Sequence, residues 1–177
     1  MWNEQIIMML LEGIKDTLYM TLTSTLIGYV IGLPMGILLT VTDKDGIHPN
    51  AAVYKVLDVI ANLIRSVPFL ILLIVLIPFT RFLIGRSYGP TATIVPLVIA
   101  AAPYIARMVE SSLKEVDAGV IEAARSMGAS NFTIVTKVML VEARTSLIVG
   151  ATISLGTILG YSAMAGTCLL YTSDAAD

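Results

Sequence analysis

The sequence predicts an all-α protein, built as a bundle of helices that span a membrane. Of its 177 residues, 56% are hydrophobic and only 14% are charged, and the mean hydropathy is +0.87. A water-soluble domain of this length needs more polar surface than this composition supplies. The apolar residues also gather into runs, and a run of about 20 helical residues crosses a bilayer core.

Four apolar runs define the expected spans. They cover residues 17–41, 67–84, 92–106 and 145–164, and a polar turn follows the first of them. Ahead of the first span, we expect Trp2 to Leu11 to form a separate interfacial helix. The N-terminus has neither a basic leader nor a small-residue cleavage site, so no signal peptide is expected.

The basic residues predict an orientation. The loops after the first and third spans hold seven Lys and Arg residues, and the opposite side holds three. The seven are Lys44, Lys55, Arg65, Arg107, Lys114, Arg125 and Lys137, and the three are Lys15, Arg81 and Arg86. Since loops rich in Lys and Arg stay in the cytoplasm, this bias places the 107–137 loop inside and the N-terminus outside.

Two rows of small residues indicate close helix packing. Gly28, Gly32 and Gly36 recur at every fourth position of the first span, and Gly156 and Gly160 do so in the fourth. Such a row lets another backbone approach. Packing within the chain is the simpler interpretation, and a subunit interface is the alternative.

The chain lacks the residue patterns of an enzyme. It has no G-x-x-x-x-G-K-[ST] loop, no nucleophile–base constellation and no paired carboxylates. With one cysteine, Cys168, and one histidine, His48, neither a metal site nor a cofactor is expected. Ionisable residues are also nearly absent from the expected spans, which argues against an ion-coupled pump. The energy for any transport must therefore come from another protein.

The loop at 107–137 contains signals for a short helix, a sharp turn and a second helix. Asp117 can cap a helix starting at Gly119, and Gly128 suits the left-handed conformation that ends one. Ser130 or Asn131 can cap the next helix. A thin helix of this kind fits a groove on a partner, although a solvated connector would have the same shape.

The same loop resembles the EAA loop of ABC-importer permeases. The resemblance rests on Glu122-Ala123-Ala124, then three residues, Gly128, nine more residues and Val138-Met-Leu140. In that family the loop docks the cytoplasmic ATPase. The resemblance therefore implies a coupling role for Glu122, Ala123, Ala124, Arg125 and Gly128. The family pattern ends in Leu-Pro, whereas Val141 follows Leu140 here, and this departure bears on the angle at which the fourth span begins.

Further segments resemble the methionine-importer branch of that family. They are Arg65–Phe69, Ile77–Thr80, Ala101–Glu110 and Gly160–Met164, in order and at matching spacing. The resemblance implies the fold of type I ABC-importer permeases and a place in the bacterial cytoplasmic (inner) membrane. The implied partners are ABC ATPase subunits, a substrate-binding lipoprotein, a second copy of this chain and the lipid bilayer, with no nucleic acid.

The resemblance also implies a function and a gate. The cargo would be methionine, and Tyr161, Ser162 and Met164 would lie where the pathway closes. Import of another amino acid or small nutrient is an alternative. A membrane scaffold that only anchors a cytoplasmic partner would also explain the loop, although it has no need of a gate.

The last residues do not fit this family. After Gly166 the resemblance implies a glycine-rich loop and a fifth span. The chain instead reads Cys168-Leu-Leu-Tyr-Thr-Ser-Asp-Ala-Ala-Asp177, which resembles the in-frame translation of a transposase sequencing adapter. We therefore expect residues 1–166 to form a permease domain with four of five spans, and residues 167–177 to be a non-native tail.

Overall fold

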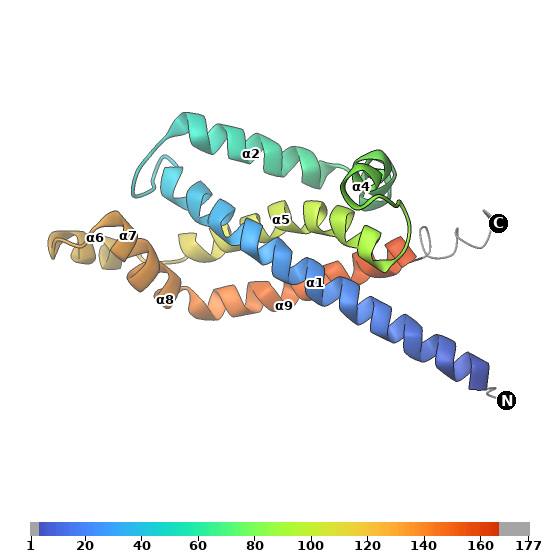
Figure 1. Ribbon diagram of the computed structural model, residues 1–177. Coiled ribbons are helices and arrows are strands. Elements are labelled where there is room, and N and C mark those ends of the chain that lie inside the picture. Colours follow the sequence, from blue (N-terminus) through green and yellow to red (C-terminus); the bar gives the residue numbers. More distant parts are fainter. Residues whose placement is uncertain (1–3, 167–177) are drawn as a thin grey trace.

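The computed structural model describes residues 4–166, and every regular element in that range is helical (Figure 1). In chain order the elements are α1 (Glu4–Thr42), α2 (Ala51–Ser66), α3 (Phe69–Val75), α4 (Ile77–Ile84), α5 (Pro90–Lys114), α6 (Ala118–Ser126), α7 (Asn131–Thr133), the π-helical segment η1 (Ile134–Met139), α8 (Leu140–Glu142) and α9 (Arg144–Ala165). The expected all-α bundle is confirmed. Within the described range, α1, α5 and α9 are long and apolar enough to cross a membrane, and α2 with α3 makes a fourth span if that bent pair is counted as one.

Three helices, α1, α5 and α9, form the centre of the bundle (Figure 1). Helices α1 and α5 run in the same direction, because Gly28 lies against Ala101 and Gly36 lies against Val109. Helix α9 runs the opposite way. Both α1 and α5 therefore end where α9 begins, and helices α6 to α8 project from there. We call this end of the molecule the α6 end.

The first row of glycines brings α1 and α5 into backbone contact. A Cβ atom at Gly32 would lie 2.7 Å from the carbonyl oxygen of Ala102, and one at Gly36 would lie 2.6 Å from that of Ala106. For this row, packing within the chain is confirmed. A Cβ atom at Gly156 or Gly160, by contrast, would meet no atom of the described residues within 4 Å.

The last span agrees with its predicted bounds, whereas the first begins earlier than predicted. The fourth was expected at 145–164 and agrees with α9 to within one residue at each end. The first was expected to begin at residue 17, after a separate interfacial helix, but α1 is continuous from Glu4. The separate helix is wrong for residues 4–11, because the junction contains only Gly13 as a weak breaker and a helix tolerates one glycine. Trp2 lies outside the described residues.

The second span differs most from its prediction. Residues 67–84 form two short helices, and residues 51–66, assigned to a loop, form α2. Helix α2 lies along α5 in the opposite direction, and the chain turns by 102° between α2 and α3. Pro68 explains the turn, since proline drives the preceding residue out of helical geometry. Val67 has φ −84° and ψ 125°.

The third span is longer than expected. It was predicted at 92–106, but α5 continues to Lys114. Its last two turns contain Arg107, Glu110 and Lys114, which pair at helical spacings of three and four residues. Such pairs stabilise a helix. The prediction ended at residue 106 because it followed apolar runs, and charged residues interrupt such a run. The expected non-native tail, residues 167–177, lies outside the described residues.

Candidate functional site

Helix α6 and the turn after it project from the bundle as the sequence predicts. Asp117 caps α6 by accepting a hydrogen bond from the backbone N–H of Gly119 at 2.7 Å. Gly128 has φ +82°, the left-handed region. The next helix is capped by Ser130, whose hydroxyl accepts from the N–H of Thr133 at 3.3 Å. Local capping chemistry thus determines the angle between α6 and the segment that leads back to α9.

The predicted coupling residues divide between two faces of α6. Ala124 is buried against the bundle, together with Ile134 and Met139. Glu122 and Ala123 are exposed. Arg125 is also exposed, and its guanidinium donates to the backbone oxygen of Ile47 at 3.2 Å. Ala123 therefore remains available to a partner, whereas Glu122 and Arg125 lie on the side of α6 that faces the α1–α2 connection.

Two large apolar side chains at the tip were missed in the sequence. Met127 and Phe132 flank the turn at Gly128 and are 82% and 78% exposed. Apolar side chains this exposed at a protruding turn are typical of residues that bind a partner. Their position beside a left-handed glycine is the signal that could have identified them.

A cluster of charges connects three helices just behind α6. Lys114 contacts Asp43 at 2.6 Å and Glu110 at 2.8 Å. Arg107 contacts Glu110 at 2.7 Å and also bonds Asp58 on α2. We call these five residues the charge cluster. The hydrogen bond from Lys114 lowers the pKa of the Asp43 carboxyl group.

The charge cluster contains a buried carboxylate. Glu110 lies in the part of α5 beyond the span expected at 92–106 and is 4% exposed. Its burial is tolerated because two cations and the Tyr54 hydroxyl, at 3.4 Å, surround it. Each of the three carboxylates contacts at least one of the two cations, so the cluster connects α2 and α5 with the residue that follows α1.

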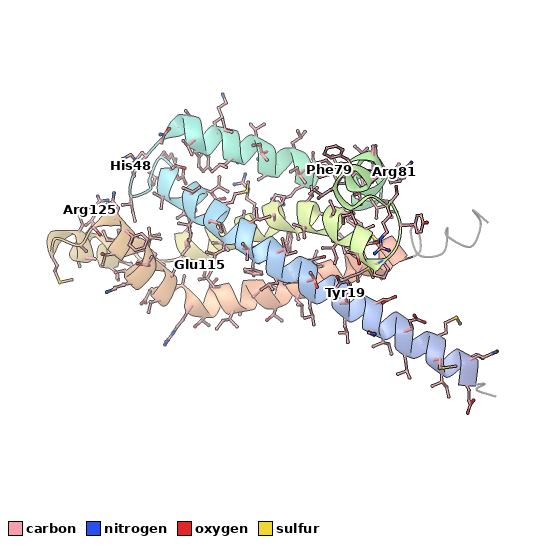
Figure 2. The ribbon with its side chains drawn as sticks, viewed as in Figure 1. Tyr19, His48, Phe79, Arg81, Glu115 and Arg125 are labelled. Carbon is pink, nitrogen blue, oxygen red and sulfur yellow. The ribbon has the colours of Figure 1, made fainter. Side chains whose placement is uncertain are left out.

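A cavity of about 580 Å³ separates the charge cluster from α6. Asp43 and Lys114 line one side, and Glu122 and Arg125 line the other. Figure 2 shows Arg125 and His48 at this end of the molecule, whereas Phe79 and Arg81 lie at the opposite end. The cavity therefore lies between α6 and the ends of α1 and α5.

The expected gate residues lie at the opposite end of α9. Tyr161 stacks on Phe69 of α3, with ring centroids 4.6 Å apart and planes 8° from parallel. Ser162 is buried and its hydroxyl lies 3.3 Å from that of Thr21 on α1. Met164 is 48% exposed. Of the three, Tyr161 lines a second cavity, which lies at the bend between α2 and α3.

Comparison with known proteins identifies the family. Residues 8–172 match the family described as "Binding-protein-dependent transport system inner membrane component". The chain belongs to this family. It is the permease subunit of an importer, with the all-helical fold of a type I ABC-importer membrane subunit, and it is a multi-pass protein of the inner membrane.

Relatives with curated descriptions cover most of this permease. It is 51% identical over 164 residues to the D-methionine transport system permease protein MetI of Salmonella typhimurium, covering 93% of this chain and 76% of that protein. The identity to MetI of Escherichia coli strain K12 is also 51%, with the same coverage.

Solved structures agree with this placement. The permease superposes on a chain of an inward-facing MetNI methionine ABC transporter with a TM-score of 0.92 and 50% identity, covering 94% of this chain and 77% of that one. An amino acid ABC transporter crystallised with histidines shares the fold, with a TM-score of 0.69 and 23% identity.

Proposed function

We propose that this permease forms the membrane pathway of an ATP-driven methionine importer. About half of its residues are identical to those of the D-methionine permeases over nearly its whole described length, and this similarity supports the choice of cargo. Two copies of the chain form the pathway. ATP is hydrolysed by separate ATPase subunits, and a substrate-binding lipoprotein delivers the methionine.

The α6 end faces the cytoplasm, and the N-terminus lies outside. Seven of the eleven Lys and Arg residues lie at the α6 end, and three lie at the opposite end. The seven are Lys44, Lys55, Arg107, Lys114, Arg125, Lys137 and Arg144, whereas Arg65 lies between the ends. This distribution satisfies the positive-inside rule, although Lys55 lies on α2, in a segment that was expected to be a loop.

The ATPase docks on the outer face of α6 and the turn after it. The observation that carries this assignment is the protruding tip, where Met127 and Phe132 are exposed beside a left-handed glycine. These apolar side chains enter a groove of the ATPase, and the Glu122 carboxylate, which is exposed and lines the cavity behind α6, adds a charge-assisted contact. Movement of the ATPase then reaches α1 and α5 through Arg125 and the α1–α2 connection.

The test is uptake of labelled D- and L-methionine by vesicles that contain the permease, its ATPase and the lipoprotein. Gly128→Val should insert and fold normally but lose ATPase association and uptake, because a β-branched residue is strained at φ +82°. Gly85→Val is the matched control, since Gly85 has the same φ of +82° but lies at the outer end of α4. Equal ATPase binding by the two variants would contradict the coupling role. Saturable uptake of another amino acid in preference to methionine would contradict the cargo.

A further inference from the structure

Arg65 lies beside the middle of α5. Its guanidinium carbon is 6.0 Å from the ring centre of Tyr104 on α5. Tyr104 is ten residues from the end of α5 at Lys114, about 15 Å along the helix at 1.5 Å per residue. Within a membrane-spanning bundle a cation against lipid is unfavourable, so arginines face a water-filled path or pair with an anion.

No carboxylate of the described residues pairs with Arg65. Every ion pair within residues 4–166 involves Lys44, Lys114 or Arg107 instead. Arg65 is exposed and sits at the last turn of α2, where the chain bends towards α3. Its guanidinium can therefore donate to a group that the permease itself does not provide.

The cavity beside Arg65 has a distinct chemical character. Its volume is about 180 Å³, and its walls include Phe69, Tyr104 and Tyr161, with Ala100 as a small neighbour. The stack of Phe69 on Tyr161 and the approach of the Tyr104 hydroxyl to that of Thr157, at 3.4 Å, hold two of these walls in place. One cation beside three aromatic rings makes a site with a charged side and an apolar side.

This arrangement fits a small molecule with a carboxylate at one end and an unbranched apolar tail. A guanidinium binds a carboxylate through two parallel N–H···O bonds, which a neutral analogue cannot accept equally well. Aromatic rings also make favourable contacts with a thioether sulfur. The cavity is smaller than the pockets of drug-sized ligands, so it suits a single amino acid and not a peptide.

We propose that Arg65 binds the carboxylate of the substrate during its passage through the permease, while Phe69, Tyr104 and Tyr161 surround the substrate's apolar tail. This inference rests on the proposed function and adds a residue that determines specificity. The site selects for a carboxylate within the membrane pathway, independently of the delivering lipoprotein. It lies where α2, α5 and α9 meet, so a change in the bend between α2 and α3 would open or close it.

The experiment measures equilibrium binding to the purified permease–ATPase complex without the lipoprotein. The probes are methionine and methioninol, which has the same tail and amino group but a hydroxyl in place of the carboxylate. The wild-type complex should prefer methionine by about tenfold or more, as expected for one charge-assisted contact. Arg65→Gln should remove this preference by weakening methionine binding, with methioninol binding changed by less than about twofold. Arg65→Lys should retain part of the preference, since it retains the charge but not the planar fork.

Arg86→Gln is the matched control, because Arg86 is an exposed arginine in the outer loop, outside the cavity. It should bind both probes as the wild type does. The thermal unfolding midpoint of Arg65→Gln should lie close to that of the wild type, which excludes a folding defect.

Parallel uptake assays separate this inference from the proposed function. Suppose that the wild type takes up methionine. The Arg65 site is then overturned, and the cargo assignment stands, if Arg65→Gln keeps the probe preference or if the wild-type complex does not bind methionine. A preference that depends on Arg65, without methionine uptake, overturns the cargo and leaves the carboxylate site intact. Absence of both uptake and binding overturns both.

Discussion

Helix α5 makes two seams with its neighbours, and they are held together by opposite kinds of interaction. Towards α1 it presents Ala102, Ala106 and Val109 to a row of glycines, so that two backbones touch. Towards α2 it presents Arg107 and Glu110 to polar side chains. The glycine seam depends on shape alone, whereas the charge cluster depends on ionisation and partner geometry.

This difference has a physical consequence for transport. Contacts between small residues are insensitive to pH and salt, and they lock two helices at a constant distance. Paired charges can exchange partners at a modest cost in free energy where water reaches them, because water supplies a competing hydrogen bond. We therefore infer that α1 and α5 move as one unit, and that any rearrangement near α6 occurs at the α2 seam.

The largest expected effect is the loss of Glu110. Glu110→Ala removes the carboxylate shared by Arg107 and Lys114, which keep Asp58 and Asp43 as partners, and each lost hydrogen bond to a charged group costs about 1.5–3 kcal/mol. Its thermal unfolding midpoint in detergent should fall well below that of the wild type. Glu115→Ala is the control, since Glu115 is exposed at the end of the same helix. If both variants unfold with the wild-type midpoint, the charge cluster does not stabilise the fold.

A smaller loss of stability is expected from a substitution in the glycine seam. Gly36→Ala places a methyl group 2.6 Å from a backbone oxygen, and overpacking of this kind costs about 1–3 kcal/mol. Gly156→Ala should be neutral or slightly stabilising, because a Cβ there meets no described atom within 4 Å. The deficit of Gly36→Ala should be the same at every pH at which the wild type is folded. A pH-dependent deficit would mean that the two seams are not independent.

The smallest effect is expected at Asp43, where the cluster meets the α1–α2 connection. Its pKa is lowered by Lys114, so its contribution is present above the unfolded pKa of about 3.9 and is lost as pH falls through the lower folded value. Because Lys114 is 42% exposed, Asp43→Asn should cost at most about 1 kcal/mol near neutral pH. Unfolding midpoints measured between pH 3 and 8 should converge with those of the wild type at the acidic end. Asp45→Asn is the control, as Asp45 is 83% exposed, and a deficit equal to that of Asp43→Asn would refute a specific contact with Lys114.

The coupling segment was predictable because its geometry is local. Asp117, Gly128 and Ser130 act on backbone groups within three residues of themselves, so their identity and spacing determine the caps and the turn. The exposure of Met127 and Phe132 was not predictable, because it depends on which side of the turn faces the bundle. The family pattern indicated which residues to examine but not how deeply each is buried.

The sequence by itself determined the helical, membrane-spanning class, the ends of the last span and the caps around α6. Each of these follows from composition, from run length or from interactions between near neighbours. Only the tertiary structure decided that α2 is a helix along α5, that Arg107 and Glu110 lie inside the bundle, and that Arg65 borders an aromatic cavity halfway along it. The reason is that the cations of α5 are also paired with carboxylates from other parts of the chain. Those partners, Asp43 and Asp58, are distant in the chain and meet α5 only when the helices pack.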